Sequence, residues 1–234
     1  MERIQGPIFD IFAAMTGSAS WQAAIISCFA VAVIIFVVFP IHECSHGLMA
    51  KILGDDTAER EGRLTLNPFA HIDLMGAVCM CFCCIGWAKP TPVSIHRCRK
   101  VKSRTALALT SLAGPVSNIL LSYVFMIAMK IVPMVSQEAT AGYVILGLYY
   151  AIVLNVYLAI FNLLPIPPFD GSKILYSFLP SKGIAFMERY SQVIYLAFFA
   201  LLIFGLLDTP LNFLTDCVIW LLDKASAFMP YPLF

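Results

Sequence analysis

The sequence predicts an all-α polytopic membrane protein with about five transmembrane helices and no separate soluble domain. Hydrophobic residues make up 60% and charged residues 12% of the 234 positions. Soluble globular proteins have about 45–50% and about 25% of these classes. A soluble domain of this size cannot bury so much apolar surface, so lipid must be the solvent for most of the chain. The net charge of +1 gives no basis for binding nucleic acid, and we expect no such partner.

Uncharged apolar runs mark the expected membrane spans. A helix needs about 20 apolar residues to cross a bilayer. Three runs are long enough, and they lie within 11–41, 105–129 and 139–169. A fourth run, within 190–207, is shorter but adequate. Acidic and basic residues interrupt a fifth run, within 209–230. We therefore expect residues 1–234 to form a single integral-membrane domain.

Residues 74–93 do not fit this pattern of spanning helices. Their uncharged part is about half as long as two crossings would need, and it contains Gly76 and Gly86 before Pro90 and Pro92. These residues favour a membrane-embedded re-entrant hairpin or a sheet-like loop. Non-helical backbone is tolerated at membrane depth only where protein shields it or where it lines a wet cavity. The segment is therefore expected to lie beside a functional cavity.

Basic residues predict the orientation of the chain. They are concentrated in segments 51–104 and 170–189, whereas the opposite side holds only Arg3 and Lys130 with certainty. The positive-inside rule therefore places both segments in the cytoplasm and the N-terminus outside. Every clear span then alternates in direction.

A metal-binding pattern follows the first apolar run. His42, Glu43 and His46 form an H-E-x-x-H motif. On a helix this spacing puts both imidazoles on one face, where they can share a zinc ion with the glutamate beside it as general base. The alternative is a helix that simply ends in the polar interface, but ionisable groups after so long an apolar run are energetically expensive.

A catalytic zinc site needs a third protein ligand. The apolar run from Ala139 ends in the proline-rich stretch 165–168, and Asp170 is the first acidic residue after it. By the distribution of basic residues, Asp170 lies at the same cytoplasmic end as His42 and His46. Prolines break a helix and can bring the chain back over its end. From the residues alone, Asp170 is equally well explained as a ligand or as part of a turn.

Other polar residues also have two interpretations. The amide of Asn162, within the third span, can donate to an oxyanion or bond another helix. His71 and Asp73 can form a second site, but satisfying loop backbone is the better explanation. Cys81 and Cys84 form a C-x-x-C without a second pair of soft ligands nearby, so packing is favoured over redox or metal chemistry.

Five stretches together resemble the site-2 protease family, the intramembrane zinc metalloproteases. They cover about residues 35–180 in the right order, and the chain is most similar to the compact prokaryotic type without a PDZ or nucleotide-sensing domain. The stretches are 42–46 (HECSH), 62–73 (GRLTLNPFAHID), 86–93 (GWAKPTPV), 112–118 (LAGPVSN) and 162–171 (NLLPIPPFDG).

The resemblance assigns roles to individual residues. It implies that His42, His46 and Asp170 bind one zinc ion per chain, that Glu43 activates water, and that Asn162 supports catalysis. It also implies that 74–93 presents an extended substrate backbone. The expected activity is hydrolysis of peptide bonds within or near transmembrane segments of protein substrates. The expected place is a prokaryotic cell membrane, with the active site toward the cytoplasm.

Three alternatives have different signatures. A transporter or channel predicts charged residues near mid-bilayer and repeat symmetry, and the sequence has neither. Another class of membrane zinc protease pairs H-E-x-x-H with a later glutamate, but Glu188 lies at a helix start outside any such pattern. A non-catalytic membrane scaffold is the third. Zinc content that is lost in His42→Ala would favour the protease interpretations.

Overall fold

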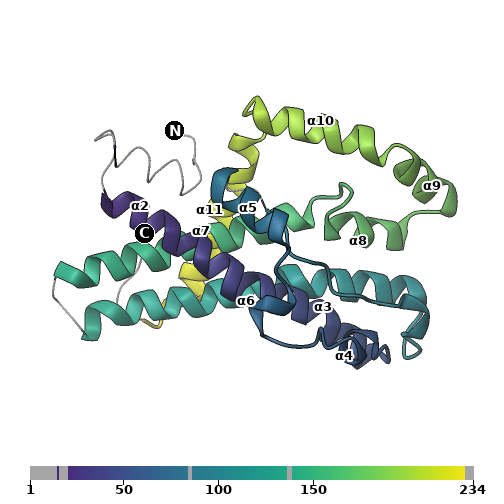
Figure 1. Ribbon diagram of the computed structural model, residues 1–234, viewed down its shortest axis with the longest axis horizontal. Helices are drawn as coiled ribbons and strands as arrows, with labels where there is room; N and C mark the ends of the chain where they lie inside the picture. The colour runs from purple at the N-terminus through teal and green to yellow at the C-terminus, as the bar shows by residue number, and fades with distance from the viewer. Residues whose placement is uncertain (1–14, 16–20, 84–85, 136–138, 230–234) are drawn as a thin grey trace.

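The computed structural model describes residue 15 and residues 21–83, 86–135 and 139–229. All regular elements within these ranges are helical, which confirms the all-α prediction (Figure 1). Two short 3₁₀ turns, η2 (Pro68–Ala70) and η3 (Ile95–Arg97), lie in the connections. The longer elements are α2 (Trp21–Val33), η1 (Ile34–Val38), α3 (Phe39–Leu53), α4 (Thr57–Arg60), α5 (Leu74–Cys83), α6 (Ser103–Val135), α7 (Ala139–Leu163), α8 (Asp170–Phe178), α9 (Ser181–Arg189), α10 (Ser191–Ile203) and α11 (Asp208–Ala225).

Within the described residues, three helices are long and apolar enough to cross a membrane: Ala24–Leu53, Ser103–Val135 and Ala141–Leu163. Helices α9 and α10, bent by 61° at their junction, make a fourth if they count as one span. The predicted number of five therefore stays a prediction. Helix α10 has 13 residues, about 20 Å at 1.5 Å per residue, and α11 is not among the candidate spans.

The first helix extends further than the prediction at its C-terminal end. Residues 11–14 and 16–20 of the expected run lie outside the described residues, and the helix continues past the H-E-x-x-H motif to Leu53. It ends at Gly54, whose φ of 110° is a left-handed conformation that glycine adopts without steric cost. The motif therefore lies inside a continuous helix.

A π-helical turn, η1, precedes the H-E-x-x-H motif within this helix. The Phe39 N–H bonds to the carbonyl of Ile34, five residues back, and Pro40 follows at once. Proline has no N–H and its ring crowds the preceding turn. The wider turn accommodates Pro40 and keeps the helix continuous.

Residues 74–93 fold into a helix and an extended return. Helix α5 forms the first arm, and an antiparallel bridge pairs Ile72 with Ala88 on the second. A Cβ at Gly76 would lie 2.1 Å from the Trp87 carbonyl oxygen, so only glycine allows the arms to pack this closely. Residues 84–85 lie outside the described residues. The first arm is therefore helical, and the location of the pair within a membrane stays a prediction.

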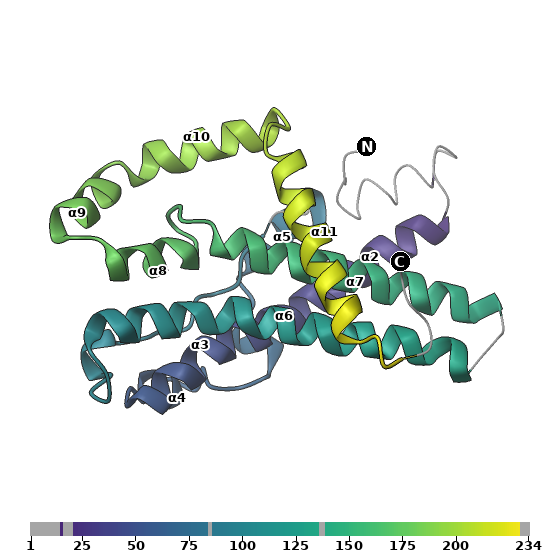
Figure 2. The ribbon, with the colours of Figure 1, turned by 180° about the vertical axis from the view of Figure 1, so that it is seen from behind.

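Helices α6, α7 and α11 enclose the largest hydrophobic cluster. Its fully buried members include Met126 of α6, Ile152 and Val156 of α7, and Ile219 of α11. Figure 2 shows α11 crossing α7 and α6, while α8, α9 and α10 form an arch that leads back to α11.

An ion pair fixes one end of this crossing. Lys130 Nζ of α6 lies 2.7 Å from Asp223 Oδ1 of α11, and both side chains are 2% exposed.

Candidate metal centre

The two motif histidines lie one turn apart on α3 with their rings edge to face. Their Nε2 atoms are 3.1 Å apart, and both side chains are buried. Because the spacing of four residues matches one helical turn, the rigid helix fixes this geometry without any loop.

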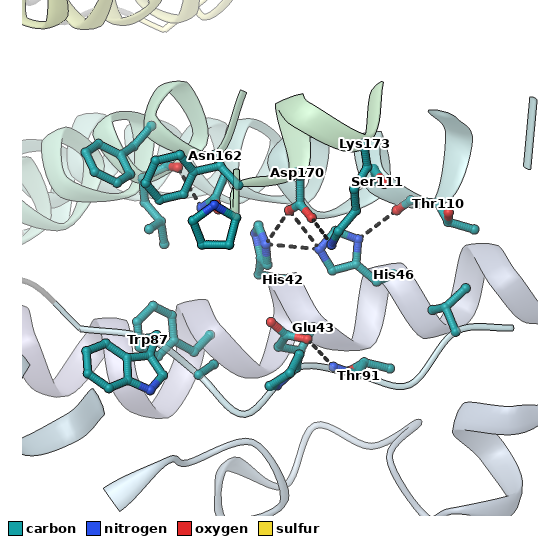
Figure 3. Close-up of a pocket in the computed structure, with 18 of the residues that line it drawn as sticks. His42, Glu43, His46, Trp87, Thr91, Thr110, Ser111, Asn162, Asp170 and Lys173 are labelled. Carbon is teal, nitrogen blue, oxygen red and sulfur yellow. Dashed lines mark hydrogen bonds and ion pairs between the residues drawn. The ribbon is translucent and has the colours of Figure 1, made fainter. Parts of the chain in front are cut away.

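Asp170 reaches the histidines from the first turn of α8. Helix α7 ends at Leu163, ahead of the proline stretch, and the chain turns back so tightly that a Cβ at Gly171 would lie 2.1 Å from the Leu163 carbonyl oxygen. The return places Asp170 Oδ2 3.3 Å from His42 Nε2 and 3.1 Å from His46 Nε2 (Figure 3).

The three ligand atoms fit a zinc ion. Two imidazoles and one carboxylate form a donor set typical of catalytic zinc sites. Ligand atoms about 2.0–2.1 Å from a tetrahedral ion lie about 3.3–3.4 Å apart. The observed separations between His42, His46 and Asp170 run from 3.1 to 3.3 Å. The atoms thus lie near three corners of a zinc-sized tetrahedron.

Helix α6 supports the histidines from behind. His46 Nδ1 lies 2.7 Å from the carbonyl oxygen of Thr110, so the Nδ1–H donates and the Nε2 lone pair is available to a metal. A Cβ at Gly114 would lie 2.5 Å from His46 Nε2 and 2.7 Å from His42 Cε1. The glycine therefore lets the backbone of α6 touch both rings.

The Asp170 carboxyl group stays ionised in this setting. Burial raises the pKa of a carboxyl group, but the polar contacts with His42 and His46 and the positive charge of Lys173 outweigh it. Together they hold the pKa of Asp170 well below its usual range. A carboxylate is the form that binds a metal.

Glu43 faces a different segment from Asp170. Its Oε2 accepts the Thr91 N–H at 2.6 Å, on the extended return that follows α5. Figure 3 shows the glutamate on one side of the histidine pair and Asp170 on the other. The carboxylate thus borders both the histidines and the extended segment, as a general base would need to.

The structure does not bring Asn162 to the three ligand atoms. It lines the same cavity, but its Nδ2 donates to the Leu158 carbonyl of its own helix at 2.9 Å. The supporting role of Asn162 stays a prediction.

His71 bonds loop backbone, as the preferred interpretation expected, whereas Asp73 bonds the backbone of the first turn of α5. His71 Nε2 lies 2.8 Å from the Thr65 carbonyl oxygen, and Asp73 Oδ1 accepts the Gly76 N–H at 2.8 Å. Of the C-x-x-C pair, Cys81 is a free half-buried thiol and Cys84 lies outside the described residues.

A cavity of about 840 Å³ opens over the ligand atoms. One wall is the extended segment from Gly86 to Val93, and aromatic side chains of α7 and α10 form another. This is large enough for several side chains of an extended peptide, because small-molecule pockets measure about 300–1,000 Å³.

The sequence interpretation missed several residues of this site. Lys173, Thr110 and Thr91 contact Asp170, His46 and Glu43, respectively. Two of these contacts use backbone atoms, which carry no residue-type signal. Gly114 had a signal, a Gly-Pro pair inside an apolar run.

Apolar helices long enough to cross a membrane, together with two imidazoles beside one carboxylate, are features of a membrane protein with a metal site. The sequence profile of peptidase family M50 matches residues 128–205. "Putative zinc metalloprotease YwhC" of Bacillus subtilis (strain 168) is 37% identical over 171 residues, which are 70% of this chain and 77% of that protein. The chain therefore belongs to peptidase family M50, which confirms the predicted resemblance.

A second relative matches a shorter stretch. "Putative zinc metalloprotease MJ0611" of Methanocaldococcus jannaschii is 46% identical over 65 residues, which are 28% of this chain and 31% of that protein. No solved structure matches the chain.

Proposed function

We propose that the protein is an intramembrane zinc endopeptidase that hydrolyses peptide bonds within or near transmembrane segments of other proteins. The observation that carries this proposal is the cluster of His42, His46 and Asp170, whose ligand atoms all lie within 4.8 Å of one another. Both histidines lie inside a helix long and apolar enough to cross a membrane. Membership of a peptidase family and two relatives named as zinc metalloproteases support the same activity.

The chemistry divides between the metal and Glu43. Zinc, when bound, polarises a carbonyl oxygen and lowers the pKa of water toward about 7. The Glu43 carboxylate accepts the proton of the attacking water and later returns it to the leaving amine. Its hydrogen bond from the Thr91 N–H holds the carboxylate in place between the histidines and the extended segment that contains Thr91.

The extended segment 86–94 is the proposed substrate platform. Polar side chains from three other places hold it: Arg63 donates to the Lys89 and Pro90 carbonyls, Glu43 accepts the Thr91 N–H, and Asp55 accepts the Ser94 N–H at 2.6 Å. An extended backbone held rigidly can pair with a substrate strand.

Pairing with this platform would stabilise a substrate that has locally unwound, because a helix shields its amides from attack. Substrates are therefore transmembrane segments with helix-breaking residues near one end.

The location is part of the proposal. The distribution of basic residues supports a cell membrane protein whose zinc site faces the cytoplasm. Its partners are then the lipid bilayer and a transmembrane protein substrate, and residues 1–234 act as one domain.

Glu43→Gln tests the activity. The amide keeps the size of the side chain but cannot accept a proton, so cleavage of a model transmembrane substrate should fall at least about 10²-fold. Zinc content should stay at about one ion per chain. Glu61→Gln, an exposed glutamate after α4, is the matched control and should keep full activity. Undiminished cleavage by purified Glu43→Gln protein would refute the assignment of the base.

A further inference from the structure

The two carboxylate oxygens of Asp170 have different partners. Oδ2 faces both histidine Nε2 atoms, at 3.1 and 3.3 Å. Oδ1 lies 3.1 Å from the ammonium nitrogen of Lys173, one turn further along α8. Figure 3 shows Lys173 approaching Asp170 from the side away from His42.

The number of Asp170 oxygens that bind a metal decides how many of its coordination positions remain for water. A carboxylate can bind zinc through one oxygen or through both. With both oxygens of Asp170 bound, the ion would have four protein donors, and water could bind only as a fifth ligand. A cation on Oδ1 opposes this, because it satisfies that oxygen and the metal repels it.

The setting of Lys173 argues against a role in fold stability. Its side chain is 49% exposed while that of Asp170 is 8% exposed, and half-exposed ion pairs contribute little to stability. Lys173 is the only lysine or arginine among the described residues that line the cavity. Its charge is therefore placed at the metal site and not at a general surface.

We propose that Lys173 is a positioning residue that holds Asp170 as a one-oxygen ligand and so keeps a coordination position open. The inference rests on the zinc site of the proposed function. Lys173 acts through Asp170 and has no part in proton transfer. Removing its charge should let Oδ1 turn toward the metal.

Cobalt substitution gives a readout that does not depend on activity. Four-coordinate Co²⁺ absorbs visible light more strongly than five-coordinate Co²⁺. Wild-type protein and Lys173→Arg should give the strong four-coordinate spectrum in detergent. In Lys173→Met we expect a weaker band of five-coordinate type when water remains bound beside a two-oxygen Asp170. On zinc, the same variant should lose at least about tenfold in kcat with little change in KM, a loss typical of outer-shell metal-site changes.

Controls separate the possible outcomes. Lys182→Met removes an exposed lysine from the next helix and should behave as wild type. Lys173→Gln serves as a second neutral variant should the methionine form fail to fold. A neutral variant whose cobalt spectrum and kcat match wild type would overturn the inference, and so would complete loss of cobalt, which would make Lys173 a residue for metal affinity. A wild-type protein that binds neither zinc nor cobalt would instead refute the proposed function itself.

Discussion

Gly114→Ala should damage the metal centre although it changes no ligand. The glycine lies where α6 passes the two imidazoles, and an added Cβ would lie 2.5 Å from His46 Nε2 and 2.6 Å from His46 Cε1. Non-bonded heavy atoms settle at about 3.5–4.0 Å, so the methyl group requires a displacement of about 1 Å. The histidine rings are buried and His46 is tied to Thr110, so either a ring or the helix must shift.

A shift of this size should be costly for both binding and catalysis. A misplacement of about 1 Å can reduce a rate about 10²-fold. Changes in groups that support metal ligands cost about 10–100-fold in metal affinity or activity. We therefore expect Gly114→Ala to lose zinc to a chelator at a concentration about tenfold or more below that needed for wild type, with cleavage reduced in parallel.

The matched control is another helical glycine. A Cβ at Gly142 in α7 meets no heavy atom within 4 Å, so Gly142→Ala should keep zinc and activity. Replacing a helical glycine by alanine can even stabilise the helix, by up to about 1 kcal/mol. Competition with a chelator and cleavage of a model substrate measure both variants. Zinc affinity in Gly114→Ala equal to that of wild type would refute the packing argument.

Three further predictions concern the third ligand, the buried ion pair and the topology. Asp170→Ala should lose zinc and activity, and Asp170→Asn should keep part of its zinc but little activity. Asp73→Ala should keep both zinc and activity. Full zinc occupancy in Asp170→Ala would show that Asp170 only forms a turn. Lys130→Met removes the ammonium 2.7 Å from a buried carboxylate and should cost about 3–5 kcal/mol, measured by unfolding in detergent, while an unchanged midpoint would contradict it. Cysteine probes at Ser103 and Gln137 should react from opposite sides of the membrane, with Ser103 cytoplasmic.

The sequence was informative where a local rule fixes the geometry. The long apolar run predicts that the segment is helical. In a helix, the spacing of four residues brings the rings of His42 and His46 together. The proline stretch correctly indicated where α7 ends, and the structure brings Asp170 back to the histidines. For Asp170 the residues alone left a turn equally possible, because no local rule relates positions so far apart in the chain.

The errors arose where tertiary packing decides. The glycines and prolines of residues 74–93 favoured a re-entrant hairpin or a sheet-like loop, but Gly76 faces Trp87 and allows close packing without ending α5, so the first arm is helical. The first span was expected to end at the motif, yet the helix continues to Leu53. Polar residues inside a helix need not end it when they face a protein interior, and His42 and His46 face α6.

Helix α6 organises the centre without supplying a ligand side chain. It packs against α3, α7 and α8, accepts the His46 hydrogen bond through Thr110, and presents the bare backbone of Gly114 to both rings. At Pro115 it lacks one N–H, so the carbonyl of Ser111, which lines the cavity, loses its helical donor and can accept another. Since the ligands come from α3 and α8, they meet only when both have docked on α6. Zinc binding should therefore stabilise the packed arrangement of these three helices, because an ion that binds only the assembled site favours the state that contains it.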